Sequence, residues 1–170
     1  MDLAALVRDV PDFPKQGILF KDITTLLRDP KAFHEAIEQL AARVKGIEFD
    51  LVVAVESRGF ILGAPLAYKL GVGFVPVRKP GKLPAQTISA EYSLEYGINK
   101  LEIHTDAIQA GERVLVVDDL LATGGSARAT VELVERLGGK VVGVAFLIEL
   151  LFLNGMDKFT GYNAFSIIQY

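Results

Sequence analysis

Short runs of apolar, mostly β-branched residues recur along the chain and constrain its fold more than any other feature. Three such runs are continuous: Leu51–Val55, Val114–Val117 and Val141–Ile148. Unbroken apolar runs are typical of strands buried on both faces, as in parallel sheets. Segments with helical spacing separate these runs. We therefore predict an α/β fold in which a mostly parallel sheet carries helices on both faces.

Helix signals fill the intervals between these strands. Apolar residues recur at helical spacing from Pro30 to Gly46, and Asp29 is placed to cap that helix. A second helix follows Gly59–Gly63, and Pro65 predicts that it is kinked or starts late. A third helix is expected to end at Gly138-Gly139. Two further strands are expected, at Phe74–Arg78 and Ala164–Tyr170.

Composition narrows the class of protein. With 51% hydrophobic and 23% charged residues, the 170 residues suit one globular domain, 1–170. The net charge of −3 predicts no basic surface for nucleic acid, and the chain has no cysteine for disulfide or thiolate chemistry. The acidic N-terminal segment and the lack of a run of roughly 18 apolar residues predict no membrane partner and a cytoplasmic location.

Residues 79–100 interrupt the alternation of strands and helices. The run Lys79–Pro84 cannot continue a regular element, and residues 87–95 alternate weakly, like an exposed strand or one arm of a hairpin. Long excursions from a compact domain are often lids or binding loops, so we expect functional residues here. By contrast, the run Phe146–Phe152 is too apolar to be left exposed.

The most informative segment is Val114–Ser126, in which a buried strand leads through Asp118 and Asp119 into a small-residue loop and a helix start. Ligands of open α/β sheets bind at the carboxyl ends of strands. The loop Ala122–Ser126 can wrap backbone N–H groups around a phosphate, and the two acids can accept hydrogen bonds from hydroxyl groups. A sugar phosphate offers a phosphate group to the loop and hydroxyl groups to the two acids. The alternative is that the acids only end a strand and cap the next helix.

This strand, acid pair and Thr-Gly-Gly-Ser loop resemble the signature of the type I phosphoribosyltransferases, which transfer the 5-phosphoribosyl group of phosphoribosyl pyrophosphate (PRPP). No Walker lysine follows the loop. Three further segments, Phe13–Ile23, Glu56–Phe60 and Tyr92–Gly97, narrow the resemblance to the members that act on adenine. The resemblance covers nearly the whole chain. It implies the type I phosphoribosyltransferase fold with a small N-terminal hood and a flexible lid loop.

The resemblance also implies roles for the strand-end residues. Asp118 and Asp119 are expected to hold the ribose hydroxyls. The 5-phosphate is expected to bind Ala122, Thr123, Gly124, Gly125 and Ser126. Ser57 and Arg58 belong to a loop that in the family binds the leaving pyrophosphate, often through a non-proline cis peptide bond. The backbone N–H groups of this loop and the Arg58 guanidinium suit that anion. A solvated ion pair between Arg58 and Glu56 is the alternative.

The lid supplies the implied catalytic residue. Glu95, followed by Tyr96, is implied to lie over the base and to share a proton at N7 while N9 attacks C1′. Without the resemblance, an exposed loop glutamate is most often only solvated. Arg78, Lys79 and Lys82 form a basic cluster suited to pyrophosphate, although each lysine could equally serve only solubility.

The base site is implied at Leu19, Phe20 and Lys21, which offer backbone contacts, an aromatic face and a charge. The family usually has arginine where this chain has Lys21. Lysine keeps the charge but loses the planar fork of the guanidinium group, so a bidentate or stacking role there is in doubt. Phe20 could equally be a core residue.

The resemblance therefore predicts an enzyme that converts adenine and PRPP to AMP and diphosphate. His34 and His104 show no paired ligand spacing, so Mg²⁺ is expected to be carried by PRPP rather than by a protein cage. A homodimer is expected, to which Phe60, Ile61 and Leu62 contribute unless they face the core. Two alternatives stay open: a PRPP-sensing regulator without catalysis, and an enzyme that acts on 6-oxopurines.

Overall fold

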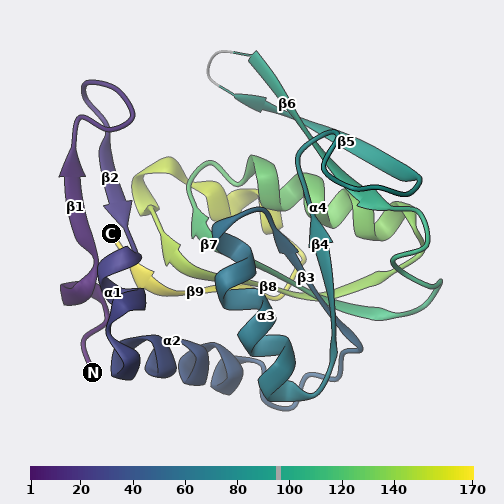
Figure 1. Cartoon of the computed structure of the whole chain (residues 1–170), viewed down its shortest axis with the longest axis horizontal. Helices are drawn as coiled ribbons and strands as arrows, with labels where there is room; N and C mark the ends of the chain where they lie inside the picture. The colour runs from purple at the N-terminus through teal and green to yellow at the C-terminus, as the bar shows by residue number, and fades with distance from the viewer. Residues whose placement is uncertain (95–96) are drawn as a thin grey trace.

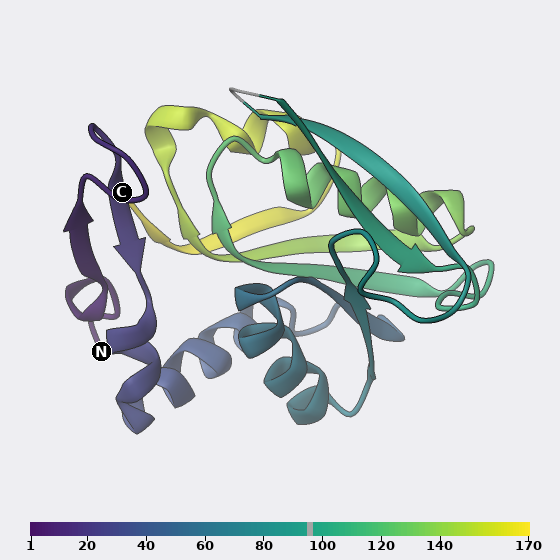
Figure 2. The same ribbon diagram turned by 45° about the horizontal axis from the view of Figure 1, so that its top comes forward.

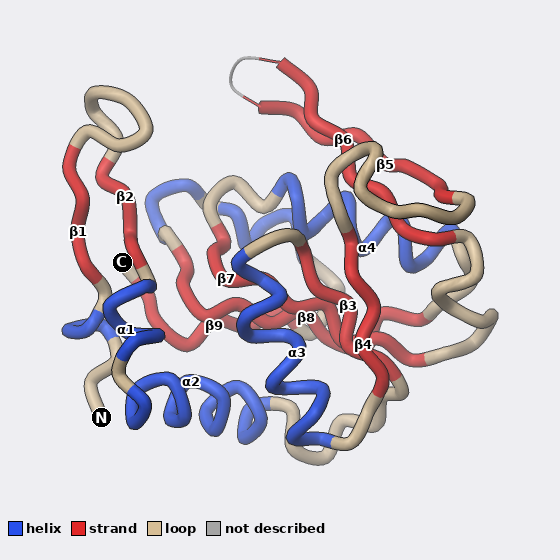
Figure 3. The backbone as a smooth tube through the Cα atoms, viewed as in Figure 1, coloured by secondary structure: helices blue, strands red, loops and turns tan. Residues whose placement is uncertain are grey.

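A five-stranded parallel sheet forms the centre of the protein (Figures 1 and 3). The computed structural model describes residues 1–94 and 97–170. Each strand of the sheet pairs in parallel with its neighbour, in the order β4-β3-β7-β8-β9. The bounds are Gly73–Val77 for β4, Leu51–Val55 for β3, Arg113–Leu121 for β7, Lys140–Glu149 for β8 and Ala164–Gln169 for β9. The predicted α/β fold with a parallel sheet is confirmed.

Helices cover both faces of this sheet, as Figure 2 shows. α2 (Pro30–Arg43) and α3 (Arg58–Leu70) lie on one face, and α4 (Gly125–Arg136) lies on the other. Neighbouring strand residues enter different cores: Val52 packs with the helices of the first face and Val53 with α4. Because both faces are buried, the central parts of β3, β7 and β8 are continuous apolar runs rather than alternating ones.

The helix boundaries follow local sequence signals, with one exception. The Asp29 carboxylate accepts hydrogen bonds from the N–H groups of Lys31 and Ala32 at 2.8 and 3.0 Å, which confirms the predicted cap of α2. α3 begins at Arg58, so of the two effects expected of Pro65 the late start is wrong, and the kink stays a prediction. The proline removes one helical hydrogen bond, and α3 packs against β3 and β7.

Two antiparallel hairpins flank the sheet. The N-terminal hairpin pairs β1 (Arg8–Pro11) with β2 (Leu19–Asp22), and the short helix α1 (Thr24–Arg28) follows it. The second hairpin pairs β5 (Thr87–Leu94) with β6 (Gly97–His104), so the predicted hairpin in the excursion is confirmed.

The β5–β6 hairpin lies over α4 in Figures 1 and 2. Its base is anchored, because Ala90, Leu101 and Ile103 are buried in the core that contains the α4 side chains. The Arg136 Nη1 of α4 also donates a hydrogen bond to the Ser89 carbonyl oxygen at 2.6 Å. The far end of the hairpin is exposed, with 65% of Ile98 accessible to solvent.

Three 3-10 helices complete the described elements: η1 (Ala4–Leu6), η2 (Leu151–Leu153) and η3 (Gly155–Phe159). The expectation that Phe146–Phe152 is buried is wrong at its end, where Phe152 is 72% exposed. β8 ends at Glu149, and the chain then leaves the sheet. Among the residues that the structure describes, no helix combines the length and the apolar character needed to cross a membrane.

Candidate active site

A cleft of about 480 Å³ lies at the carboxyl ends of β3, β4 and β7. Parallel strands end at one edge of a sheet, so this topology gathers loops that are distant in the sequence. The β5–β6 hairpin contributes the remaining wall. The lining residues are Val55, Glu56, Ser57, Arg58, Lys79, Tyr92, Leu101, Asp118, Asp119, Leu120, Ala122 and Ser126.

The acid pair lies inside β7, which continues to Leu121 beyond the predicted apolar run. Successive strand residues point to opposite faces, and the two carboxylates have different polar partners. The Arg58 Nε atom of α3 is 2.7 Å from Asp119 Oδ2, whereas the Ser126 hydroxyl of α4 lies 3.5 Å from Asp118 Oδ2. The N-cap of α4 is Gly124, and no side chain caps it. The alternative that the acids cap this helix is therefore wrong.

Both acids are buried, each with an exposed fraction of 6%. Burial raises the pKa of Asp118 well above its usual range, and the charge of Asp119 raises it further. Burial also raises the pKa of Asp119, although the Arg58 guanidinium opposes this shift. Hydroxyl groups that donate to the charged carboxylates would lower both pKa values. The pair therefore suits the hydroxyl groups of a sugar.

The loop between β7 and α4 is built by close backbone packing. Gly124 has a φ of +83°, which glycine adopts without steric cost. A Cβ atom at Gly124 would lie 2.9 Å from the Gly155 carbonyl oxygen, and a Cβ atom at Gly155 would overlap the Ala122 carbonyl oxygen. η3 therefore supports this loop directly. The first N–H groups of a helix lack helical partners, so the loop and the start of α4 can bind an anion.

The turn between β3 and α3 offers a second anion site. The peptide bond between Glu56 and Ser57 is cis, as the resemblance implies. The N-terminus of α3 faces the cleft, and Gly59 lets it approach β7, because a Cβ atom there would lie 3.0 Å from Asp118 Oδ1. Arg58 pairs with Asp119 rather than with Glu56, so the alternative ion pair is wrong.

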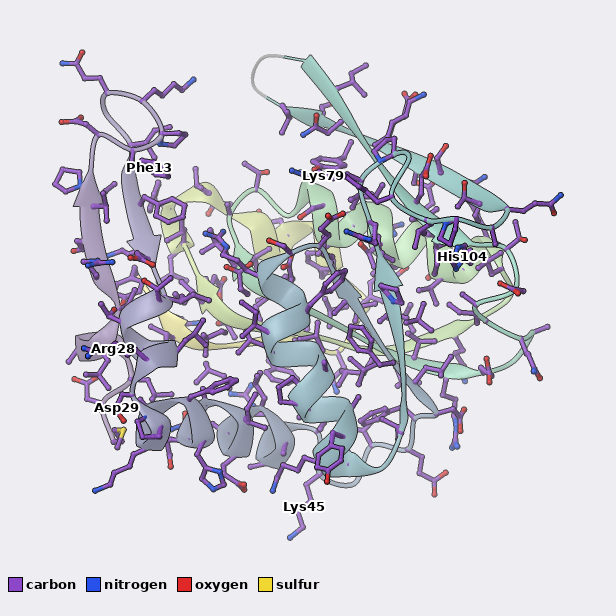
Figure 4. All side chains as sticks on the ribbon, viewed as in Figure 1. Phe13, Arg28, Asp29, Lys45, Lys79 and His104 are labelled. Atoms are coloured by element: carbon purple, nitrogen blue, oxygen red, sulfur yellow. The ribbon has the colours of Figure 1, made fainter. Side chains whose placement is uncertain are left out.

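Glu56 instead binds the residues that follow β4. Its carboxylate accepts hydrogen bonds from Arg78 Nη2 and from the Lys79 N–H group, both at 2.9 Å. The Arg78 bond is the main reason why the pKa of Glu56 is lowered. Lys79 lines the cleft, beyond the end of β4 in Figure 4. Arg78 also donates a hydrogen bond to the Lys82 carbonyl oxygen at 3.3 Å, so Arg78 and Lys82 shape this loop. The phosphate contacts of Arg78, Lys79 and Lys82 stay predictions.

The β1–β2 hairpin places Phe20 beside the cleft residue Arg58, whose guanidinium carbon lies 5.0 Å from the centre of the Phe20 ring. Phe13, at the loop of the hairpin in Figure 4, packs edge-on against the same ring at 5.1 Å. Phe20 is half-buried and, among the described residues, belongs to neither buried core. Leu19 is 49% exposed, and the Lys21 ammonium points to Asp9. Their contacts with a base stay predictions.

Some site residues escaped the sequence analysis, and two predicted ones lie outside the described residues, namely Glu95 and Tyr96. Leu120 directly follows the acids, which was an available signal. Tyr92 stands in a segment that carries the resemblance, but its place in the cleft depends on how the hairpin packs. A Cβ atom at Gly125 would lie 3.1 Å from Tyr92 Cδ2, so the tyrosine covers the start of α4.

Neither histidine lies in the cleft. His34 is 3.4 Å from Glu38 on the surface of α2, and His104 Nε2 accepts a hydrogen bond from the Ala85 N–H group at 3.2 Å. Within the described part of the chain, no group of three or more His, Cys, Asp or Glu side chains could hold a metal ion.

A larger hollow, of about 620 Å³, lies at the opposite, amino ends of the strands, between the C-terminal parts of α2 and α3. Its lining includes the cations Lys45 and Arg113, and Arg113 pairs with Glu48 at 2.6 Å and with Asp50 at 2.9 Å. The acid pair and the two anion loops lie at the other cleft, which is therefore the candidate site.

The acid pair thus lies between two loops that can bind anions, with the Phe20 ring beside one of them. A model of the phosphoribosyl transferase domain matches residues 22–169, and the chain belongs to the phosphoribosyltransferase family. The adenine phosphoribosyltransferase of Acetivibrio thermocellus is 59% identical, with 100% of both chains covered. That of Caldanaerobacter subterraneus subsp. tengcongensis is also 59% identical, with 99% of this chain and 98% of the relative covered.

Two solved structures are similar over the same length. The adenine phosphoribosyltransferase of Thermoanaerobacter pseudethanolicus matches with a TM-score of 0.98 and 58% identity, covering 99% of this chain and 98% of that one. That of Saccharomyces cerevisiae, complexed with D-2,5-dideoxy-2,5-imino-altritol 1,6-bisphosphate and adenine, matches with a TM-score of 0.91 and 43% identity, covering 97% and 96%. All four of these relatives are adenine phosphoribosyltransferases.

Proposed function

We propose that the protein is an adenine phosphoribosyltransferase, a pentosyltransferase of purine salvage whose residues 1–170 form a single catalytic domain. It transfers the 5-phosphoribosyl group of PRPP to adenine and yields AMP and diphosphate. One observation carries this proposal: a single cleft joins the buried acid pair to a loop at the N-terminus of α4 and a second at the N-terminus of α3. Full-length identity of 59% to enzymes for adenine favours adenine over 6-oxopurines.

The order of groups along the cleft matches the order of groups in PRPP. The 5-phosphate binds the loop Ala122–Ser126, and the ribose hydroxyls bind the adjacent acids Asp118 and Asp119. Arg58 contacts Asp119 at 2.7 Å, so the pyrophosphate site adjoins the ribose site. Phe20 lies against the same guanidinium, so a base stacked on this ring would lie beside the leaving group. Both partners of the bond exchange at C1′ are therefore held together.

The reaction breaks the bond from C1′ to the pyrophosphate oxygen and forms the bond from C1′ to N9. No covalent nucleophile is needed, because positioning and electrostatic stabilisation act on the leaving group. Arg58 and Lys79 line the cleft where negative charge develops. Glu56 aligns this side of the site by accepting hydrogen bonds from Arg78 and from the Lys79 backbone. On the family resemblance, Glu95 shares the proton at N7 of the base.

Mg²⁺ enters as part of the substrate, as the magnesium complex of PRPP. The described residues offer no cage of three or more metal-binding side chains, whereas pyrophosphate and ribose oxygens suit a small hard cation. When bound, the ion neutralises charge on the leaving group. The cleft residues that face the same oxygens are Arg58 and Lys79, which hold and orient them.

We also propose a homodimer that uses the outer face of α3. Of the three residues named for this role, Ile61 is 40% exposed, whereas Leu62 is fully buried and Phe60 packs against the core. Tyr68 on the same helix is 88% exposed. Light scattering of the purified protein tests the dimer. The cytoplasmic location stays a prediction.

The activity is tested by incubating the protein with Mg²⁺, PRPP and adenine and by quantifying AMP and diphosphate together. Equal amounts of both products are expected. In a matched control, Asp118→Asn with Asp119→Asn, both products are lost because the ribose contacts are weakened. If PRPP binds while adenine is not consumed, the protein is a PRPP-sensing regulator instead.

A further inference from the structure

The β1–β2 hairpin depends on few contacts for its position beside the sheet, because its two strands pack chiefly against each other. One of these contacts involves Lys21 of β2, whose side chain is only 9% exposed. Its ammonium lies 2.6 Å from Asp9 Oδ1, on the residue that pairs with Lys21 across the hairpin. The same ammonium lies 3.7 Å from the centre of the Tyr170 ring. The lysine therefore joins the hairpin to the end of the sheet.

Tyr170 is a fixed partner for this ammonium. Its N–H group donates to the Glu149 carbonyl oxygen at 3.0 Å, and its own carbonyl accepts from the Leu151 N–H group at 2.9 Å. Its hydroxyl donates to the Ala4 carbonyl oxygen at 3.0 Å. Burial and the nearby Asp9 and Asp2 raise the pKa of this phenol, so it stays protonated and keeps that bond. Figures 1 and 3 show the C-terminus beside β2.

Lys21 is also the immediate neighbour of Phe20, and successive residues of a strand point to opposite faces. One face of the hairpin is thus held by the Asp9–Lys21–Tyr170 contacts, while the other presents the Phe20 ring to Arg58 at 5.0 Å. A tilt of the hairpin on the held face would displace the ring on the other. Arg58 in turn is bound to Asp119, which fixes the position that the ring must match.

We propose that Lys21, held between Asp9 and the ring of Tyr170, is a positioning residue that sets the β1–β2 hairpin so that Phe20 meets the nucleobase. Its side chain acts through the hairpin rather than by touching the base. This inference rests on the proposed function. It also explains how a lysine can serve at a position where the family usually has arginine: a point charge over an aromatic face needs no planar fork.

The test compares the KM values for adenine and for PRPP, with kcat, in four variants. Lys21→Gln removes the charge, and Tyr170→Leu removes the aromatic face while keeping an apolar side chain. Each is expected to raise the KM for adenine about tenfold, the range of one cation–π contact, and to change the KM for PRPP by less than about twofold. Tyr170→Phe and Lys21→Arg keep ring and charge, and they are expected to retain the wild-type KM for adenine.

The combined variant Lys21→Gln with Tyr170→Leu separates positioning from general stability. If the two residues act as one contact, the combined variant raises the KM for adenine no more than the single variant with the larger rise. Independent effects would instead multiply. A parallel rise in the KM values for both substrates, or a lower melting temperature with unchanged KM values, overturns the inference. A wild-type protein that does not consume adenine overturns the proposed function as well, so the two failures are distinguishable.

Discussion

Gly155→Ala should weaken PRPP binding although residue 155 does not line the cleft. Gly155 is buried at the start of η3, and a Cβ atom there would overlap the Ala122 carbonyl oxygen and lie 2.9 Å from Leu121 Cδ1. Alanine fits the backbone conformation at this position, since φ lies outside the left-handed region. The collision with a loop carbonyl therefore decides the outcome.

The size of the effect follows from the displacement. A carbon atom and a carbonyl oxygen in contact lie about 3.3 Å apart, so the Ala122 carbonyl must retreat by about 1 Å. The N–H groups of the same loop move with it. A hydrogen bond to a charged group contributes about 1.5–3 kcal/mol, so the loss of one weakens PRPP binding by about 10- to 150-fold. Overpacking also lowers the free energy of unfolding by about 1–3 kcal/mol.

The assay is calorimetric titration of PRPP into the variant, with thermal unfolding measured on the same sample. Gly143→Ala is the matched control, because Gly143 is also buried, near the amino end of β8, and a Cβ atom there would lie 3.0 Å from Leu115 Cδ1. This control should lose stability while PRPP affinity stays within about twofold. Wild-type PRPP affinity in folded Gly155→Ala, or equal losses of affinity in both variants, would refute the reasoning.

Three further predictions concern carboxyl groups. Glu95→Gln should lower kcat by about 100-fold, the scale of general acid–base catalysis, with little change in PRPP affinity; equal turnover of variant and wild type would remove its proton-handling role. Asp118→Asn should weaken PRPP binding at least about tenfold yet stabilise the free protein at neutral pH. Because the pKa of Asp118 is raised, its carboxyl group holds a proton more tightly in the folded state than in the unfolded state. Wild-type stability therefore falls as pH rises above about 4, and denaturant titrations of the variant should lack that fall. Asp22 behaves oppositely: hydrogen bonds from the Thr24 N–H group and from Arg8 lower its pKa to about 2, so its contribution is present above about pH 4 and is lost as pH falls toward 2. Asp22→Asn should reduce the loss of stability between pH 5 and pH 2.5, and an unchanged acid denaturation curve would contradict this.

Local patterns predicted the elements whose signals are contained in a few residues. β3 spans the predicted Leu51–Val55 because polar residues flank that apolar run on both sides. Asp29 caps α2 as expected, because the cap needs only the next turn of chain. β7 extends past its predicted end, since Asp118 and Asp119 break the apolar pattern while remaining in the strand. They do so at the carboxyl end of β7, where both side chains are buried and line the cleft.

Partners across the fold were beyond local patterns. Glu56 is the neighbouring acid of Arg58 in sequence, yet Arg58 pairs with Asp119, because the carboxyl ends of β3 and β7 lie side by side. The support of the phosphate loop by Gly155 and the contact of Lys21 with Tyr170 also depend on how distant segments pack. The resemblance could indicate which residues gather at the site, but the geometry that connects them required the structure.

A competition assay tests the central claim most directly. Equal concentrations of adenine, hypoxanthine and guanine are incubated together with the protein, Mg²⁺ and limiting PRPP, and the nucleotides formed are identified by mass spectrometry. AMP as the dominant nucleotide, formed in an amount equal to the diphosphate released, is the predicted result. IMP or GMP as the main nucleotide, or diphosphate without any nucleotide, would contradict the assignment of adenine as the acceptor.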